Sequence, residues 1–247
     1  MAWPDDVGIK SGLIGAVFVV APSVTDQIVI DQDVTGQDLT VEVWSDVACP
    51  WCYIGKTRFQ AALDRFENKD RVKVIWRSYQ LAPETPVGEG RTELEALVEM
   101  KGMAPDQVRQ MFSSVANTAA EVGLDLDFDT AIAANTFDAH RLLHLAGDKQ
   151  ADLLEALFKA HFSDGKVIDD REELVRIAVS VGLDADTVRA QLASDAAADA
   201  VREDLSMARQ FQVSGVPFFV ANRAIAVSGA QPEEVFLQLL TQASESA

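Results

Sequence analysis

Alternating hydrophobic and polar positions predict two strands in the first third of the chain. Leu39 to Trp44 and Arg71 to Tyr79 alternate in this way and are rich in β-branched residues. Between them, from Pro50 to Glu67, apolar residues recur at near-helical spacing, and Pro50 suits the first turn of a helix. The three predicted elements together have the length of a βαβ unit.

The middle of the chain, from residue 92 to residue 209, has a helical pattern and no predicted strand. Gly-Leu-Asp turns at residues 123–125 and 182–184 help to divide it, and Asp148 and Asp184 are predicted N-caps. The predicted helices cover residues 92–101, 105–122, 128–134, 136–146, 149–161, 170–181, 184–193 and 196–211.

Strand patterns return near the C-terminus. Residues 217–220 and 224–227 are short apolar runs on either side of Asn222-Arg223, which predicts a tight hairpin, and a helix over 231–240 follows, opened by Pro232 at its first position. Strands on both sides of an all-α block indicate one α/β domain with an inserted helical region. The predicted division is an N-terminal extension (1–38), a discontinuous α/β domain (39–82 and 212–247) and a helical insertion domain (83–211).

The N-terminal extension contains an apolar run from Gly12 to Ala21. Its ten residues are about half of the roughly 20 that a helix needs to span a bilayer. The preceding residues include Asp5 and Asp6 against one Lys10, which is unlike the basic start of a secretory signal. We interpret the run as a leader or an extra strand, with export as an atypical secreted protein the alternative.

Composition and charge narrow the class of protein. Hydrophobic residues make up 48% of the chain, which is enough for a sizeable core. The 39 Asp and Glu against 21 Lys and Arg give a formal charge of -18, so the surface should repel nucleic acid and anionic membranes. The acidity is interpreted mainly as a solvating surface, with cationic or unfolded-protein partners as the alternative.

The two cysteines, Cys49 and Cys52, lie two residues apart and predict redox chemistry. A disulfide between two residues so close in sequence cannot stabilise a fold of this size. A thiol at a helix N-terminus is instead suited to chemistry, because free N–H groups and the helix dipole stabilise its thiolate form. Cys49 is the predicted nucleophile, and the more buried Cys52 is predicted to resolve the mixed disulfide. Pro50 and Trp51 rigidify the turn, and Trp51 either contacts substrate or packs.

Several other polar residues are candidates for a role in the chemistry. A zinc site of Cys49, Cys52, His140 and His144 has the right ligand types but the wrong spacing, so no metal is predicted. His144 and His161 are interpreted as ordinary helix residues, whereas a functional and a structural role are equally supported for His140. Asp46 is interpreted as a turn or capping residue, with a proton relay for the buried thiol as the alternative.

The sequence VEVWSDVACPWCYIGKTRF, at residues 41–59, resembles the opening of DsbA-like oxidoreductases of the thioredoxin superfamily. It is most similar to the FrnE-like branch, which includes 2-hydroxychromene-2-carboxylate isomerases and kappa-class glutathione transferases. The resemblance continues in family order through WRSYQLAP (76–83), NTFDAHRL (135–142), VSGVPFF (213–219) and VSGAQ (227–231).

The resemblance implies a thioredoxin fold with an inserted helical domain. It implies a cis peptide bond between Val216 and Pro217, facing the two cysteines and presenting backbone groups to an extended substrate. It places His140 in the helical region that faces the thiols. The expected substrate-binding residues are therefore Val216, Pro217, Trp51, Pro50 and His140.

These features predict a protein disulfide oxidoreductase that acts on thiol or disulfide proteins. No cofactor is predicted, glutathione is considered only as a redox partner, and a homodimer is left open. Because no further cysteine exists, an external redox partner must complete the cycle. The first alternative is a glutathione-dependent isomerase or transferase, whose relatives typically lack the full Cys pair, and the second is a holdase-like binding module. The predicted location is cytoplasmic.

Overall fold

The chain is built around a mixed β-sheet. The computed structural model describes residues 17–19 and 39–246, and the strands in this part run in the spatial order β1-β5-β4-β2-β3. β2 and β3 are parallel, and the other neighbouring strands are antiparallel. The strands are β1 (Val17–Val19), β2 (Leu39–Ser45), β3 (Val72–Ser78), β4 (Phe218–Ala221) and β5 (Ile225–Ser228). The four strands predicted from residue 39 onward are confirmed, with ends shifted by one residue.

β1 lies at the edge of the sheet and comes from the apolar run near the N-terminus. Its residues 17–19 pair antiparallel with residues 225–227 of β5. The interpretation of this run as an extra strand is therefore confirmed for those three residues. The rest of the predicted extension over 1–38 lies outside the described residues.

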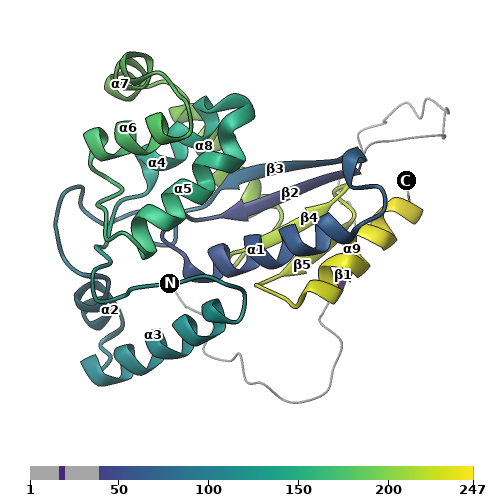
Figure 1. Cartoon of the computed structure of the whole chain (residues 1–247), viewed down its shortest axis with the longest axis horizontal. Helices are drawn as coiled ribbons and strands as arrows, with labels where there is room; N and C mark the ends of the chain where they lie inside the picture. The colour runs from purple at the N-terminus through teal and green to yellow at the C-terminus, as the bar shows by residue number, and fades with distance from the viewer. Residues whose placement is uncertain (1–16, 20–38, 247) are drawn as a thin grey trace.

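Two helices cover one face of the sheet (Figure 1). The first, α1 (Pro50–Arg65), joins β2 to β3 and confirms the βαβ unit, and the second, α9 (Glu233–Glu245), closes the chain. Their contact with the sheet is aromatic, because the rings of Phe59, Phe219 and Phe236 lie 4.6 to 5.6 Å apart. The predicted helix over 231–240 is thus found, although Pro232 occupies the N-cap position instead of the first helical position.

The helix α8 (Ala198–Gln210) packs on the opposite face. Trp44 of β2 is fully buried there, against Ala208 and the ring of Phe211, whose centroid lies 5.4 Å away. The indole N–H of Trp44 donates to the backbone oxygen of Asp204 at 3.1 Å. Alternate positions of β2 therefore serve two different hydrophobic clusters, as expected for a strand covered on both faces.

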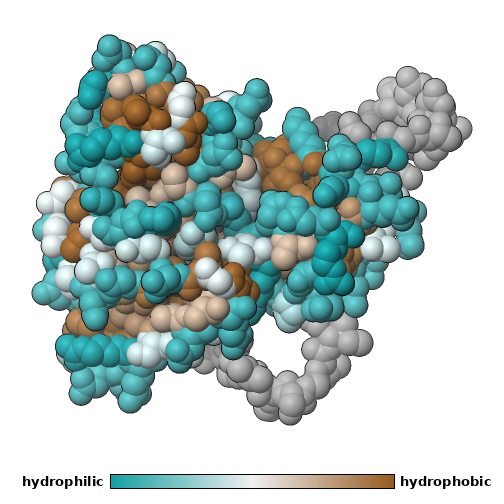
Figure 2. All heavy atoms as spheres, viewed as in Figure 1, coloured by the Kyte–Doolittle hydropathy of each residue, from teal (hydrophilic) through white to brown (hydrophobic). Residues whose placement is uncertain are grey.

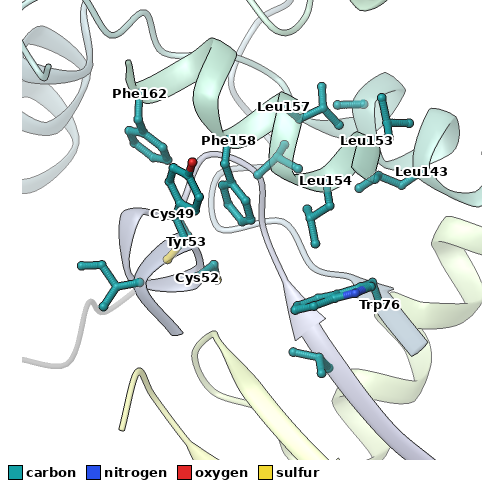
Figure 3. Close-up of a cluster of buried hydrophobic side chains, with 14 of the residues drawn as sticks. Cys49, Cys52, Tyr53, Trp76, Leu143, Leu153, Leu154, Leu157, Phe158 and Phe162 are labelled. Atoms are coloured by element: carbon teal, nitrogen blue, oxygen red, sulfur yellow. The ribbon is translucent and has the colours of Figure 1, made fainter. Parts of the chain in front are cut away.

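The helical region between β3 and β4 gathers beside the end of the sheet to which β2 and β3 run (Figure 1). Its core continues that of the sheet, with Leu153, Leu157 and Phe158 of α5 almost completely buried (Figure 3). The remaining helices are α2 (Glu93–Lys101), α3 (Pro105–Ala120), α4 (Phe137–Leu145), α5 (Gln150–Phe162), α6 (Arg171–Ser180) and α7 (Ala185–Ala193).

One predicted helix, over residues 128–134, is wrong. The side chain of Asp127 accepts from the backbone of Asp129 and the hydroxyl of Thr130, which forms a turn instead. The next residues lie antiparallel to the start of α2, with Ile132 bridging Thr92. Backbone groups that a helix would have paired internally are therefore paired across the chain.

Helix caps follow local side-chain chemistry in part. Asp184 caps α7 by accepting from the backbone N–H of Thr187, as predicted. Asp148 does not cap α5, because it lies inside a short 3-10 turn, Gly147–Lys149, and Lys149 holds the cap position. The predicted hairpin turn is confirmed, with Asn222 and Arg223 in the left-handed region at φ values of 49° and 54°.

The visible surface is mainly hydrophilic, with hydrophobic patches over the helical region (Figure 2). Three large hydrophobic side chains are exposed among the described residues, namely Val87, Met100 and Val179. Within that same part of the chain, no helix has the length and apolar character required to cross a bilayer.

Candidate functional site

Cys49 and Cys52 lie where β2 leads into α1. Cys49 is the N-cap of α1 in an extended conformation, and Pro50 occupies the first helical turn, where its missing N–H is not needed. The carbonyl of Cys49 accepts from the N–H groups of Cys52 and Tyr53, at 3.0 and 3.3 Å. Both cysteines are free thiols. The predicted start of the helix at the Cys pair is therefore confirmed.

The two thiols are almost fully buried, at 1% exposure for Cys49 and 0% for Cys52. Burial is the largest cause that raises the pKa of Cys52 well above its ordinary value, and the adjacent Cys49 raises it further. The backbone of Asp46 and the hydroxyl of Ser45 face the same sulfur and oppose this rise. Cys52 is therefore held as a thiol and needs a proton acceptor before it can react.

Val216 and Pro217 lie against the first cysteine. The thiol of Cys49 donates to the backbone oxygen of Val216, with the sulfur and the oxygen 3.7 Å apart. The Val216–Pro217 peptide bond is cis, the isomer that the resemblance implied. Pro217 is buried against α1, where only a glycine fits, because a Cβ on Gly55 would lie 2.7 Å from its ring carbon Cγ.

The two residues between the cysteines differ in exposure. Pro50 is buried, whereas Trp51 is half-buried and packs on the edge of the hydrophobic core. Trp51 thus meets both solvent and protein, and a substrate contact for it stays a prediction. The ring of Tyr53, on α1, stacks on the ring of Phe158, on α5 (Figure 3). The two ring centroids lie 4.8 Å apart.

His140 lies on α4 and reaches the loop that precedes Cys49. Its side chain is 2% exposed, and its Nε2 lies 3.4 Å from Oδ1 of Asp46. The structure therefore brings His140 to the loop before Cys49, where it contacts Asp46.

Both carboxylate oxygens of Asp46 accept hydrogen bonds from the backbone, and one of them also lies near His140. Its carboxylate accepts from the backbone N–H groups of Ala48, at 3.3 Å, and Leu81, at 2.7 Å. Asp46 thereby ties the loop before Cys49 to the exit from β3, which agrees with its interpretation as a turn residue.

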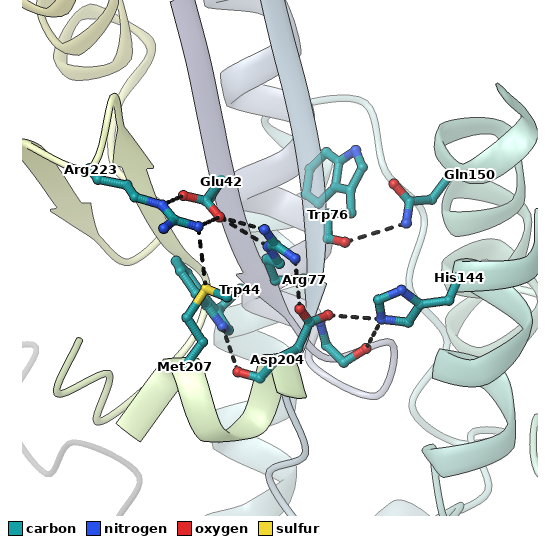
Figure 4. Close-up of polar contacts among 10 residues, drawn as sticks. Glu42, Trp44, Trp76, Arg77, His144, Gln150, Asp204, Met207 and Arg223 are labelled. Carbon is teal, nitrogen blue, oxygen red and sulfur yellow. Dashed lines mark hydrogen bonds and ion pairs between the residues drawn. The ribbon is translucent and has the colours of Figure 1, made fainter. Parts of the chain in front are cut away.

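His144, one turn after His140, is part of an ion-pair network that sequence reasoning missed (Figure 4). Its Nε2 lies 2.8 Å from Oδ2 of Asp204 and 3.2 Å from the hydroxyl of Ser78. Asp204 also accepts from the backbone of Ser78 and pairs with Arg77. Burial alone would raise the pKa of Asp204, but the bonds from His144 and Ser78 and the charges of His144 and Arg77 lower it overall.

A buried glutamate extends this network across β2. Glu42 is 2% exposed and pairs with Arg77 at 2.6 Å and Arg223 at 2.7 Å. Burial raises its pKa, yet the two guanidinium groups outweigh that effect and lower it. The sequence signal for this network was Glu42, a charged residue in the middle of the predicted strand LTVEVW. Its partners, Arg77 and Arg223, lie far away in the chain and could not be identified from local pattern.

The remaining histidine, His161, lies in the last turn of α5. It is fully buried, with Nε2 3.3 Å from Oε1 of Glu93. Across the described residues, no three His, Cys, Asp or Glu side chains gather in a way that could hold a metal ion.

The site borders a small groove. A cavity of about 60 Å³ opens beside Asp46 and Ala48, and its walls include Leu81 and Leu97. Exposed Met100 of α2 stands at the same groove. The groove is mixed in character, since Glu93 and Thr136 also line it, and it lies next to the residues that lead into Cys49.

Comparison with known proteins places this geometry in a family. The sequence matches the DSBA-like thioredoxin domain family over residues 40–241, so the chain belongs to that family and has its thioredoxin fold. The structure is similar to that of a probable DsbA oxidoreductase from Streptomyces coelicolor, with 44% identity and a TM-score of 0.81, over 85% of this chain and 91% of the other.

Two more distant structures share the fold. The first is 2-hydroxychromene-2-carboxylate isomerase, with 17% identity and a TM-score of 0.62, over 84% of this chain and 98% of the isomerase. The second is the cytosolic disulfide reductase DsbM from Pseudomonas aeruginosa, with 17% identity and a TM-score of 0.58, over 82% of this chain and 98% of DsbM. The resemblance to the DsbA family is therefore confirmed, and the isomerase and DsbM share the fold.

Proposed function

We propose that the protein is a thiol–disulfide oxidoreductase that exchanges disulfides with thiol or disulfide substrates through Cys49 and Cys52. The observation that carries the proposal is the position of Cys49. Its sulfur sits at the N-terminus of α1, 3.7 Å from the Val216 oxygen, with the buried Cys52 one turn further along the helix. Similarity to a probable DsbA oxidoreductase supports the same chemistry.

All bond changes of the proposed reaction on the enzyme take place at the two cysteine sulfurs. In the reducing direction, the Cys49 thiolate attacks one sulfur of a substrate disulfide, which forms a mixed disulfide and releases a substrate thiolate. Cys52 then loses its proton and attacks the Cys49 sulfur, so that the Cys49–Cys52 bond forms and the second substrate thiolate leaves. The substrate gains two electrons, the Cys pair loses two, and the reverse sequence oxidises a substrate.

The Val216–Pro217 loop is the proposed platform for an extended substrate segment. The Val216 carbonyl already faces the Cys49 sulfur, so a substrate sulfur bound there would lie beside backbone groups able to pair with its own chain. Pro50 and Trp51 lie between the two cysteines, and the groove beside Ala48 lies near them. We expect Trp51 to contact substrate and His140 to support the substrate site through its contact with Asp46 in the loop before Cys49.

An external redox partner must restore the Cys pair after each turnover. Low-molecular-weight thiols such as glutathione are the proposed partner, and no bound cofactor is required. A reducing compartment, the cytoplasm, keeps the pair as a dithiol and suits the reductase direction.

The second candidate is a glutathione-dependent isomerase or transferase, which the shared fold of 2-hydroxychromene-2-carboxylate isomerase favours. Such an enzyme needs one thiol or hydroxyl at the position of Cys49 and no resolving thiol. The presence of Cys52, buried behind Cys49, argues for disulfide exchange instead.

Trapping of the mixed disulfide tests the proposal. The variant Cys52→Ser, mixed with oxidised glutathione or a disulfide-containing peptide, should accumulate a covalent adduct at Cys49 that mass spectrometry detects. Wild-type protein should pass through this adduct to the internal disulfide, and Cys49→Ser should form no adduct. Isomerisation without any change in thiol content would favour the second candidate.

A further inference from the structure

A small cavity lies between the end of the sheet and α4. Its volume is about 10 Å³, which is the space of about one water molecule. It is lined by polar or charged residues from three elements, Ser45 from β2, Arg77 and Ser78 from β3, and His140 and His144 from α4, together with Trp76, Leu143 and Leu154. A water there would have the two to four polar partners that buried waters typically have.

Two residues next to Cys52 lead toward the cavity. Ser45 lines it, and its buried hydroxyl makes no hydrogen bond within the described part of the chain, while the same hydroxyl opposes the rise in the pKa of Cys52. The backbone of Asp46 opposes that rise as well, and the Asp46 carboxylate lies 3.4 Å from Nε2 of His140. That nitrogen is buried and makes no hydrogen bond within the part of the chain that the structure describes.

The cavity connects to the surface at His144. His144 contacts Ser78 at 3.2 Å and Asp204 at 2.8 Å, and its side chain is 18% exposed. A titratable ring thus joins the cavity to solvent, while Asp204 balances its charge. Figure 4 shows His144 reaching from α4 toward Asp204 on α8.

We propose that Ser45, His140, His144 and one water in this cavity carry the proton of Cys52 to and from solvent during disulfide exchange. The inference rests on the proposed function and adds residues to it. Cys52 cannot attack the mixed disulfide until its proton leaves, and its sulfur has no exposed surface. His140 and His144 act through Ser45 and the water, so they are positioning residues for the transfer.

The Cys52 S–H proton passes to Ser45, whose own hydroxyl proton moves to the cavity water and on to an imidazole nitrogen. His144 releases a proton to solvent, and the Cys52 thiolate attacks Cys49 to displace the substrate thiolate, which takes up one proton outside. No electron moves along the path. The titratable or charged groups around it are Asp46, Arg77, Tyr79, His144 and Asp204.

Stopped-flow reaction with an excess of the disulfide DTNB separates the two chemical steps. Attack by Cys49 releases the first thionitrobenzoate at a rate that rises with DTNB concentration, and resolution by Cys52 releases the second at a rate independent of it. We expect His140→Gln and Ser45→Ala to slow the second phase by about tenfold or more near pH 7. The first phase should change by less than about twofold, because neither side chain touches Cys49 in the structure.

The pH profile distinguishes proton transfer from a structural effect. The deficit of His140→Gln should shrink as the pH rises, because hydroxide then removes the proton directly, and a solvent deuterium isotope effect on the second phase should be smaller than in wild type. His161→Gln is the matched control, since His161 is equally buried in the helical region but faces Glu93. It should resolve at the wild-type rate.

Resolution at the wild-type rate in both Ser45→Ala and His140→Gln would overturn the inference. Equal slowing of both phases at every pH, with loss of stability, would also overturn it and indicate a structural role. If His140→Gln does not fold, Ser45→Ala carries the test alone. Release of a single thionitrobenzoate by wild type, as by Cys52→Ser, would instead contradict the proposed function itself.

Discussion

Gly55 is predicted to set the distance between α1 and the Val216–Pro217 loop. It lies one turn after Cys52, in the middle of the buried face of the helix. A Cβ built at this position would lie 2.7 Å from Cγ of Pro217 and 3.4 to 3.5 Å from Ala230. The first contact is too short for real atoms, and both neighbours belong to the chain that enters and leaves the β4–β5 hairpin.

The magnitude of Gly55→Ala follows from two opposing effects. An alanine in a helix interior is normally about 1 kcal/mol more stable than a glycine. Overpacking of a tight core costs about 1–3 kcal/mol, and Pro217 can retreat only by moving the backbone of the loop. We therefore expect a net loss of unfolding free energy of up to about 2 kcal/mol, whereas an unhindered helix position would gain stability.

The loop must move by several tenths of an ångström to accommodate the methyl group, which carries the Val216 oxygen away from the Cys49 sulfur. We expect the rate of Cys49 attack on DTNB to change by a few-fold, up to roughly tenfold, because reacting groups are sensitive to sub-ångström displacement. Urea unfolding and stopped-flow kinetics measure the two effects.

Gly215→Ala is the matched control for stability. Gly215 lies in the same loop, a Cβ there meets nothing within 4 Å, and its φ does not fall in the left-handed region. It should be as stable as wild type or slightly more stable. If Gly55→Ala gains the helix-propensity increment and attacks DTNB at the wild-type rate, the close approach of α1 to Pro217 is not a constraint and the reasoning is refuted.

Three further predictions concern the framework around the site. Ala197→Gly should stabilise the fold by about 1 kcal/mol in urea unfolding, because Ala197 is held in the left-handed region at φ 59°; unchanged or lower stability would contradict the strain. Asp204→Asn should destabilise the protein by about 3 kcal/mol near pH 7, since it breaks a buried pair with Arg77 and His144. The pKa of Asp204 is lowered from an ordinary value of 3.8, so its carboxylate stabilises the fold above about pH 4 and that contribution is lost as the pH falls through the lowered pKa. The gap between wild type and Asp204→Asn should therefore close in acid, and a gap that persists would contradict this origin.

The sequence predicted the parts of the fold that depend on local pattern. Alternation identified β2 and β3, helical spacing identified α1, and Asn222-Arg223 marked the hairpin, because each signal acts over a few neighbouring residues. The predicted helix over 128–134 was wrong because Ile132 pairs with Thr92, a partner that local spacing cannot reveal. The predicted cap at Asp148 was also wrong, because Asp148 lies inside the 3-10 turn Gly147–Lys149 and Lys149 holds the cap position of α5.

The reactive cysteines were predicted from the sequence, but the polar contacts around them were not. The Cys pair is a local motif. The resemblance supplied Val216 and Pro217, and the structure places the Val216 oxygen at the Cys49 sulfur. Asp204 and Ser78, in contrast, meet His144 only after α4 and α8 pack on the sheet. His144 was read as an ordinary helix residue because nothing in its own sequence neighbourhood shows the aspartate that pairs with it.

The oxidation state of the Cys pair in defined glutathione buffers tests the central claim most directly. Wild-type protein equilibrated across a range of reduced and oxidised glutathione should show one reversible transition between dithiol and disulfide, followed by alkylation and by the fluorescence of nearby Trp51. The transition should be absent in Cys49→Ser. Thiols that remain unmodified across the whole range, together with tight binding of reduced glutathione, would contradict the account and favour the isomerase or transferase alternative.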